Sequence, residues 1–193
     1  MEPTATKKEL SHQRIVDAAA HAIRRSGFSG VGVADVMKEA GLTHGGFYAH
    51  FGSREAMLAE AMARAGEDSS EGLTQRAEKL RTRGASPLRA LVEGYLSETH
   101  LIDAESGCPV AALLAEVPRQ SPELRDVALQ RLHSLVETVR HLLPDPQAKE
   151  QAMVIAATLV GALQMARALG ANAKGKAMLA AACQSLLAEH DPA

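Results

Sequence analysis

The sequence predicts an all-α protein, and three observations lead to this prediction. Apolar residues recur at spacings of three and four along most of the 193-residue chain, which is the period of an amphipathic helix. No stretch alternates apolar and polar residues over a useful length, as a half-buried strand would. Glycine, proline and serine divide the chain into segments of helical length. With 46% hydrophobic residues, the chain can bury the core of one large domain or two small ones.

Two helices separated by a glycine-rich loop are predicted at the N-terminal end. The first covers residues 7–26, where Thr6 and Glu9 have the spacing of a capping box. Gly27 ends it, because glycine readily adopts the backbone conformation that follows a helix. The second helix covers residues 33–40 and also ends at a glycine. The two helices form the first part of a compact helical head.

A third, shorter helix is predicted over residues 44–50 and has two opposed faces. Phe47 and Phe51 are four residues apart, so they lie on one side and can anchor in a core. His44 and Tyr48 are also four apart and lie on another side, pointing away from that core. Helix, tight glycine turn and helix together form a helix-turn-helix arrangement.

Two adjacent glycines, Gly45 and Gly46, lie inside this third helix. Each glycine costs a helix about 1 kcal/mol relative to alanine. A sequence that accepts this cost indicates that the backbone of this helix must come close to a neighbouring molecule or helix. A DNA duplex is one candidate for that neighbour, and a tightly crossing helix is the other.

The rest of the chain predicts six further helices separated by breaks rich in glycine, proline and serine. They are expected over residues 53 to the low 80s, 87–102, 110–117, 123–143, 147–169 and 174–189. Several begin after serine or at proline, which is typical of helix N-termini.

One run of the chain, residues 11–58, combines these features in a specific order. Its segments are Arg14-Ile15-Val16-Asp17-Ala18-Ala19, Gly27-Phe28, Val33-Ala34-Asp35-Val36, Ala40-Gly41-Leu42-Thr43, Gly46-Phe47-Tyr48-Ala49-His50-Phe51 and Ser53-Arg54-Glu55-Ala56-Met57-Leu58. In order and spacing this run resembles the tetracycline-repressor (TetR) family of bacterial regulators. It covers about a quarter of the chain, and the remainder is similar to the family in length and helical character.

The resemblance implies a helix-turn-helix DNA-binding domain over residues 1–54 and a helical ligand-binding and dimerisation domain over residues 55–193. It implies a homodimeric transcriptional repressor that binds a palindromic double-stranded DNA operator and is released by a small-molecule inducer. The residues that would contact DNA are Thr43, His44, Gly45, Tyr48, His50 and Arg54. The family often has Ser or Thr capping the second helix and touching phosphate, whereas this chain has Gly32 there.

Charge is distributed in the direction that this interpretation needs. Residues 1–54 hold seven Lys and Arg against five Asp and Glu, a net +2, and residues 55–193 hold fourteen against eighteen, a net −4. A more basic head suits nucleic acid. Because the excess is small, contacts with phosphate would come mostly from backbone amides, hydroxyls and a few cations.

A dimer contact is predicted on the helix over 147–169 together with the helix over 123–143. Small residues on the first of these helices let two helix axes approach closely, and the family resemblance favours a seam across a twofold axis. The expected residues are Leu132, Val136, Ala157, Gly161 and Gln164. The alternative is that they pack inside one protomer.

The expected ligand pocket is poor in aromatic residues, since Tyr95 is the only aromatic side chain beyond residue 60. A cage for flat cations needs stacked aromatics, so a small or aliphatic inducer, or a reactive electrophile, fits better. The expected lining is Leu91, Tyr95, His100, Cys108, Leu113 and Met165. The alternative for each of them is ordinary core packing.

Cys108 allows a second interpretation, a regulator that senses oxidants or electrophiles. It lies at the start of a short helix, where backbone amides favour a thiolate. Free cysteines are also commonly buried in cores, so packing remains the alternative for Cys108 and is expected for Cys183.

The sequence contains no motif for catalysis, so no enzymatic activity, cofactor or metal site is expected. The chain starts without an apolar segment, and its longest apolar stretch suits a buried helix. We therefore expect a cytoplasmic protein that does not enter the membrane. The remaining alternatives are a helical-bundle enzyme or carrier with a helix-turn-helix-like corner, and a DNA-binding protein that activates rather than represses.

Overall fold

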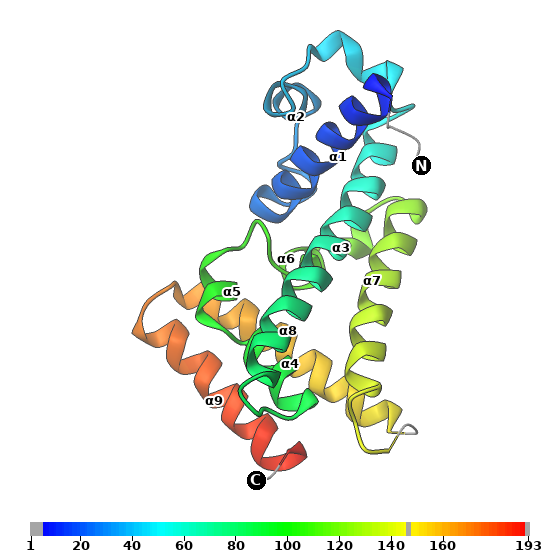
Figure 1. The fold of residues 1–193 in the computed structure, drawn as a ribbon. Coiled ribbons are helices and arrows are strands. Elements are labelled where there is room, and N and C mark those ends of the chain that lie inside the picture. Colours follow the sequence, from blue (N-terminus) through cyan, green and yellow to red (C-terminus); the bar gives the residue numbers. More distant parts are fainter. Residues whose placement is uncertain (1–5, 146–147, 192–193) are drawn as a thin grey trace.

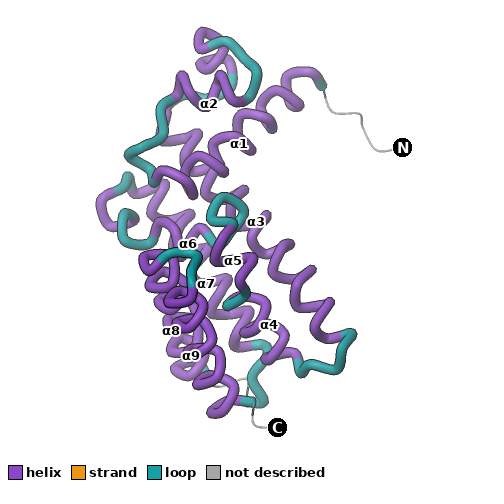
Figure 2. Tube along the Cα trace, turned by 90° about the vertical axis from the view of Figure 1, so that its left-hand side faces the viewer, coloured by secondary structure: helices purple, strands orange, loops and turns teal. Residues whose placement is uncertain are grey.

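The chain runs from a small helical head into a larger helical body (Figure 1). The structure, a computed structural model, describes residues 6–145 and 148–191. Its helices are α1 (Lys7–Ser26), α2 (Val33–Glu39), the 3-10 helix η1 (His44–Ala49), α3 (Arg54–Arg81), α4 (Pro87–Tyr95), α5 (Glu98–Ile102), α6 (Pro109–Leu113), the 3-10 helix η2 (Val117–Arg119), α7 (Pro122–Arg140), α8 (Lys149–Leu169) and α9 (Ala173–His190). No strand occurs in the two described ranges (Figure 2). The all-α prediction is confirmed.

Polar caps explain where most of these helices begin. Thr6 and Glu9 form the predicted capping box at the start of α1, each side chain accepting the other's backbone N–H. Side-chain oxygens accept backbone N–H groups in the first turns of α3, α4, α5, α7 and α9; they belong to Ser53, Ser86, Ser97, Ser121 and Asn172. Capping hydrogen bonds join residues two or three positions apart, so they can be predicted from sequence. Most of the predicted helix N-termini are accordingly close to the observed ones.

The predicted helix over 87–102 is wrong, because the chain breaks between α4 and α5. Leu96 leaves the helical conformation, and the hydroxyl of Ser97 accepts the backbone N–H of His100 at 3.3 Å. A serine that caps a new helix competes with continuation of the old one. The predicted helix over 110–117 is also shorter, since α6 ends at Leu113 and η2 follows.

The predicted third helix of the head is a 3-10 helix, η1. Gly46 donates its backbone N–H to the carbonyl of Thr43 at 3.0 Å, a three-residue spacing. Two adjacent glycines weaken an α-helix at this position. Thr43 occupies the predicted N-cap position with extended backbone angles, but its side chain makes no capping hydrogen bond.

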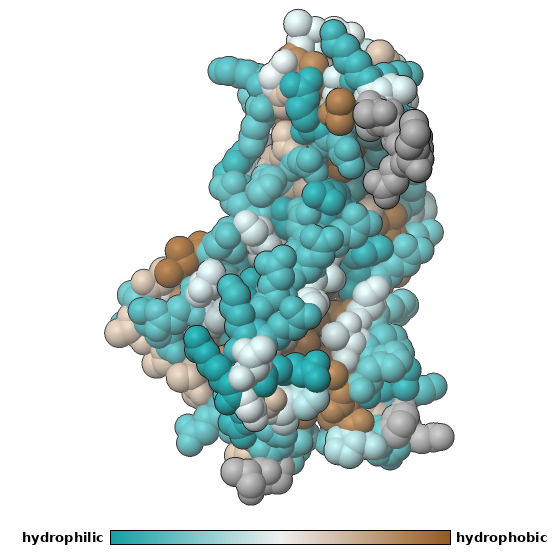
Figure 3. Space-filling model, in the orientation of Figure 1, coloured by the Kyte–Doolittle hydropathy of each residue, from teal (hydrophilic) through white to brown (hydrophobic). Residues whose placement is uncertain are grey.

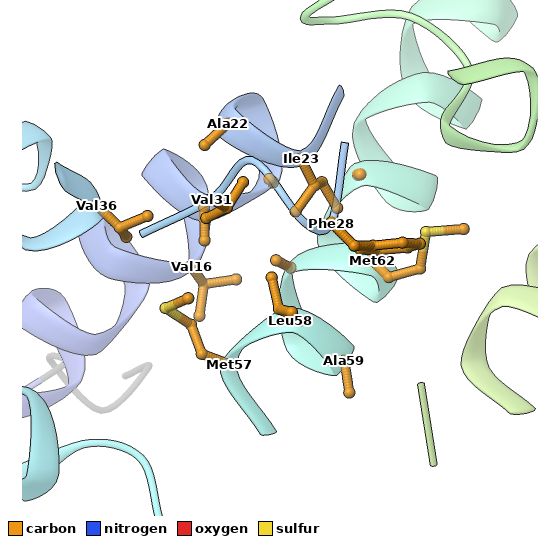
Figure 4. Close-up of a cluster of buried hydrophobic side chains, with 14 of the residues drawn as sticks. Val16, Ala22, Ile23, Phe28, Val31, Val36, Met57, Leu58, Ala59 and Met62 are labelled. Atoms are coloured by element: carbon orange, nitrogen blue, oxygen red, sulfur yellow. The ribbon is translucent and has the colours of Figure 1, made fainter. Parts of the chain in front are cut away.

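The core of the head extends into the body. In Figure 4 the buried side chains of Ile23 and Phe28 lie beside Met62 of α3. The same cluster includes four buried residues from α6, η2 and α7, namely Leu113, Val117, Leu124 and Ala128. The predicted division at residue 54 coincides with the start of α3, but core packing continues across it. The DNA-facing helices therefore rest on elements of the body.

A second core fills the body between α4 and α9, with α8 at its centre. Ile155, Leu159 and Leu163 of α8 are completely buried in this cluster. Among the described helices, α8 alone is long and apolar enough to cross a membrane by length and composition. Its place in the core accounts for the apolar residues on its inner side, whereas Met153, Val154, Met165 and Leu169 are exposed.

Arg24, at the end of α1, ties the head to the body. Its side chain is completely buried and forms an ion pair with Asp68 of α3 at 3.2 Å. Its Nη1 donates to the carbonyl oxygens of Ala65 at 3.2 Å and Gly107 at 3.5 Å. One guanidinium thus joins α1, α3 and the loop before α6.

Glu116 makes a second connection between head and body. Its carboxylate accepts the backbone N–H of Phe28 at 3.0 Å, just after α1 ends. Gly27 has a φ of 72°, and a Cβ atom there would overlap the carboxylate of Glu116. Glycine is therefore required by both the turn and the close approach.

Candidate nucleic-acid interface and ligand cavity

The 3-10 helix η1 turns one side into the head and the other to solvent. Phe47 and Phe51 are 2% and 3% exposed, and their rings stack with centroids 5.5 Å apart. Tyr48 is 75% exposed and contacts the ring of Phe47 edge-on. The predicted orientation of these three side chains is confirmed.

Neither glycine of η1 is required by a neighbouring helix. A Cβ atom on Gly45 would meet nothing within 4 Å, and one on Gly46 would make only ordinary contacts with Met37 and Thr43. Neither glycine has a positive φ. The sequence offered two explanations for these glycines, a DNA duplex and a tightly crossing helix. Among the described residues no helix crosses closely enough at Gly45 or Gly46 to require a glycine. The smooth surface at Gly45 is available to something outside the protomer.

Four predicted DNA-contact residues form one outward surface, which we call the η1 face: Thr43, His44, Gly45 and Tyr48. All four are exposed, and η1 lies at the end of the head farthest from the body (Figure 1). Hydroxyl, imidazole and phenol groups are thereby presented together, and all of them can hydrogen-bond to phosphates or base edges.

His50 is placed differently from the η1 face. It is half-buried, its ring centroid lies 5.9 Å from that of His12, and its Nδ1 is buried without a hydrogen-bond partner. Burial, followed by the neighbouring His12 and Lys8, lowers the pKa of His50. His50 is thus favoured in its neutral form at neutral pH, with fewer N–H donors than an imidazolium.

Arg54 supports the loop between α1 and α2. Its Nε donates to the carbonyl oxygen of Val31 at 3.1 Å, and its Nη2 donates to that of Phe28. Its side chain is about one-third exposed (34%). Contact of Arg54 with a flanking phosphate stays a prediction, and the structure adds an architectural role for the guanidinium.

The body contains an open cavity of about 250 Å³ between α3, α4, α6 and α7. Its lining comprises Gly66, Ser69, Ser70, Leu73, Thr74, Ala77, Glu78, Arg81, Pro87, Leu91, Tyr95, Cys108, Pro109, Val110, Arg131, Ser134, Leu135, Thr138 and Leu142. In Figure 3 hydrophobic surface is visible in the region between α4 and α7. The cavity combines an apolar wall with a few polar groups, as ligand sites do.

Three of the six predicted ligand residues, Leu91, Tyr95 and Cys108, line this cavity. Leu113 does not, because it is completely buried in the head core. Met165 does not either, because its side chain lies on the outer surface of α8 and is 52% exposed. Sequence periodicity could not show which sides of α6 and α8 face the cavity.

His100 lies behind the cavity wall and fixes two of its residues. The backbone N–H of Cys108 donates to Nε2 of His100 at 2.9 Å, so Nδ1 carries the proton and donates to the carbonyl of Tyr95 at 2.7 Å. Burial lowers the pKa of His100 to about 4. The neutral imidazole therefore positions Tyr95 and Cys108 without itself lining the cavity.

Arg131, which was not among the predicted ligand residues, lines the cavity from α7. Its Nε is buried without a hydrogen-bond partner. A Cβ atom on Gly66 would overlap the aliphatic part of Arg131, so the glycine lets that side chain cross α3. A glycine in the middle of a 28-residue helix was the signal that a neighbour passes close by.

The predicted dimer residues divide into two groups. Ala157 is exposed, and a Cβ on Gly161 would meet nothing within 4 Å. Leu132 and Val136, by contrast, are half-buried against the core of their own protomer. Gln164 donates to the carbonyl of Ala111 at 3.1 Å within the same chain. For these last three residues the structure shows contacts within the protomer, and their part in a dimer contact stays a prediction.

Cys183 does not line the cavity that contains Cys108. Cys183 is half-buried beside a separate cavity of about 230 Å³ between α4, α5 and α9, away from Cys108, and burial raises the pKa of its thiol. Within residues 6–145 and 148–191, no group of three or more His, Cys, Asp or Glu side chains could hold a metal ion.

Comparison with known proteins gives consistent matches along the chain. Residues 15–61 match the family described as bacterial regulatory proteins, tetR family, and residues 84–182 match the tetracyclin repressor-like C-terminal domain. An uncharacterised HTH-type transcriptional regulator of Mycobacterium tuberculosis is 31% identical over 166 residues, covering 80% of this chain and 83% of the relative.

Solved structures share the fold at lower identity. A TetR-family transcriptional regulator from Agrobacterium tumefaciens has a TM-score of 0.76 and 21% identity, covering 95% of this chain and 99% of that one. AibR, solved in complex with isovaleryl coenzyme A and operator DNA, has a TM-score of 0.64 and 17% identity, covering 94% and 98%. The family consists of regulators rather than enzymes, which removes the enzyme alternative. From its head, its body and these matches, the chain belongs to the TetR family of helix-turn-helix transcriptional regulators.

Proposed function

We propose that this protein is a homodimeric, ligand-responsive repressor that acts in the cytoplasm and binds a palindromic operator through the η1 face. The observation that carries the proposal is the exposed η1 face itself, with Tyr48 at 75% exposure beside a glycine that no intramolecular contact requires. A large aromatic side chain held outward on a buried anchor is expected where a partner surface is met. In a helix-turn-helix protein that surface is the major groove and its flanking phosphates.

Two heads must act together, because the short η1 face can contact only a few base pairs. Paired heads of this type occupy half-sites about 34–36 Å apart. We place the dimer contact on the outward side of α8, where four large apolar side chains are exposed: Met153, Val154, Met165 and Leu169. Ala157 and Gly161 lie on the same helix and allow a close approach of a second copy. An apolar face of this kind suits a self-complementary twofold interface.

Inducer binding can reach the head through the loop before α6. Cys108 and Pro109 line the cavity, and the preceding residue, Gly107, accepts a hydrogen bond from Arg24 of α1. A ligand that displaces this loop would alter the support of α1. A coupling free energy of about 1–3 kcal/mol is usual for allosteric regulators. Release of the operator on binding is therefore within reach of these contacts.

The operator-binding proposal can be tested with fragments of the protein's own genome. Wild-type protein should retain specific fragments, with an affinity that falls as salt rises because phosphate contacts release counterions. Tyr48→Ala should weaken that binding at least tenfold with little change in the free energy of unfolding, since the side chain is exposed. Ile102→Ala, which removes a side chain that is 66% exposed on the body, serves as the matched control and should bind normally.

The outcomes separate the alternatives cleanly. Normal operator binding by Tyr48→Ala would remove the η1 face from the interface. A reporter gene placed behind a retained fragment distinguishes repression from activation: expression should rise when the regulator is deleted. A fall in expression on deletion would show an activator.

Sensing of electrophiles through Cys108 is a second candidate, because its thiol lines the cavity rather than the core alone. Cys183 lies at a separate cavity, so sensing would proceed by modification of one thiol rather than by a disulfide between the two. Cys108→Ser should then abolish release of DNA by a thiol-reactive electrophile such as N-ethylmaleimide, while the wild type responds. An equal response of both proteins would exclude this mode.

A further inference from the structure

We infer that the cavity between α3, α4, α6 and α7 binds a small organic anion with an aliphatic tail, whose carboxylate meets Arg131 and Tyr95. That this anion is the inducer rests on the proposed function. That the cavity binds such an anion depends only on the contacts of Arg131 and Tyr95.

The first contact is a guanidinium without a counterion. Nε of Arg131 is buried and has no hydrogen-bond partner. No acidic side chain of the described residues forms an ion pair with it within 4.0 Å. Asp68, two residues after Gly66 on α3, is paired with Arg24 and Arg64, both at 3.2 Å. A partly buried arginine is normally paired, and an unsatisfied buried donor calls for a partner. A carboxylate matches the planar fork of a guanidinium.

The second contact is the hydroxyl of Tyr95, which is buried beside the thiol of Cys108 and has no nitrogen or oxygen partner among the described residues. The side chain is 1% exposed and lines the same cavity. Burial, with the adjacent Cys108 as a further cause, raises the pKa of this phenol well above its ordinary value. The group therefore stays protonated and can donate its O–H to an anion.

Both donors line the same cavity, from two different helices. Arg131 enters it from α7 beside Gly66 of α3. Tyr95 enters it from α4 and lies beside Cys108. A carboxylate inside the cavity is therefore offered both groups.

Arginine side chains surround these donors. Arg167 lies behind Tyr95 and Cys108, donates only to the carbonyl of His100 in the described chain, and has a buried Nε without a partner. The carboxylate of Asp103 interacts with Arg167 from beyond ion-pair distance. Among the described residues of the lining, Glu78 is the only carboxylate, and twelve residues along α3 place it roughly 18 Å from Gly66. An anion beside Arg131 would therefore meet more positive than negative charge.

The rest of the cavity suits an aliphatic chain. Its walls include Leu73, Leu91 and Leu135, whereas the hydroxyls of Thr74 and Thr138 already donate to carbonyls of their own helices. A volume of about 250 Å³ has room for about eight water-sized groups, taking about 30 Å³ for each. An eight-carbon carboxylate, with ten non-hydrogen atoms, is close to this size, and the cavity is open at one side.

The test uses the full-length protein with octanoate and its uncharged analogue 1-octanol as probes, measured by isothermal titration calorimetry. Octanoate should bind at least tenfold more tightly than 1-octanol. Arg131→Met should weaken octanoate about 10- to 100-fold, the usual effect of losing a charged hydrogen bond, and leave 1-octanol unchanged. Arg131→Lys should keep part of the affinity, and Tyr95→Phe should lose several-fold. Arg125→Met, an exposed position on the same helix, is the control and should match the wild type.

Three results would overturn the inference. They are failure of wild-type protein to bind octanoate at millimolar concentration, equal binding of octanoate and 1-octanol, and unchanged octanoate affinity in Arg131→Met. Retained 1-octanol binding shows that the variants are folded. Operator binding is measured separately, so Arg131-dependent octanoate binding by a protein that retains no DNA would contradict the proposed function and leave the anion site intact.

Discussion

Replacing Arg24 by methionine should destabilise the protein strongly, although Arg24 is far from the η1 face. Its guanidinium is completely buried and bonds to Asp68, to Ala65 and to Gly107. Methionine preserves much of the apolar stem and removes the charge and all of these hydrogen bonds. The change therefore isolates the polar junction between head and body.

The size of the effect follows from the contacts that are lost. A hydrogen bond to a charged group contributes about 1.5–3 kcal/mol, and bonds to buried carbonyls contribute about 1 kcal/mol each. Two features reduce the total: Asp68 keeps its pair with Arg64 at 3.2 Å, and the cost of burying the guanidinium disappears. We expect a loss of about 2–4 kcal/mol in the free energy of unfolding, which lowers Tm by about 5–15 °C in a chain of this size.

The neighbouring Arg25 is a matched control. It also contacts two carboxylates, Glu39 and Glu105, each at 3.1 Å, but all three side chains are 43% exposed. Exposed ion pairs contribute at most about 1 kcal/mol, so Arg25→Met should lower Tm by less than about 4 °C. Thermal and urea unfolding followed by circular dichroism measure both variants. Equal losses in the two, or a negligible loss in Arg24→Met, would refute the reasoning.

Three further predictions concern the interface, the cavity wall and the dimer. Gly45→Ala should raise the free energy of unfolding by up to about 1 kcal/mol, because alanine restricts the unfolded chain, yet weaken operator binding; unchanged affinity in retention assays would rule out close approach of DNA there. The pKa of His100 is near 6.5 in the unfolded protein and about 4 in the folded protein. The contribution of its neutral imidazole to the free energy of unfolding is therefore complete above pH 6.5 and is lost as the pH falls toward 4. The free energy of unfolding should therefore fall by about 2 kcal/mol between pH 7 and pH 5, and in urea titrations this loss should be absent from His100→Gln; persistence of the loss would assign it to other groups. Val154→Arg should produce monomers in light scattering, and Ile102→Arg should not; dimers in both would move the contact away from α8.

The head could be predicted from sequence in considerable detail because its determinants are local. The capping box at Thr6 and the four-residue spacing of Phe47 and Phe51 each fix a structure within one or two helical turns. The 3-10 geometry of η1 was missed because two glycines weaken the α-helix without specifying its replacement. The supporting role of Arg54 was missed because its partners lie 23 and 26 residues away.

The body was less predictable because its contacts depend on which side of each helix faces inward. α8 is apolar on nearly all sides, so periodicity did not reveal that Met165 faces outward while Leu163 is buried. Leu113 was expected at the cavity, but α6 turns it toward the head core. In the sequence, Arg131 resembles an ordinary solvent-facing residue of an amphipathic helix. The structure shows instead that its side chain passes against Gly66 of α3.

The shared core of head and body limits how this regulator could be rebuilt. Leu113, Val117, Leu124 and Ala128 complete the hydrophobic layer beneath α1 and α3. An isolated fragment of residues 1–54 would leave that layer open to water and should aggregate or stay unfolded. A chimera that lends this head to another sensor body would need to carry over the first half of α3, α6, η2 and the first two turns of α7. The natural joint for such engineering therefore lies deeper in the molecule than the helix-turn-helix boundary.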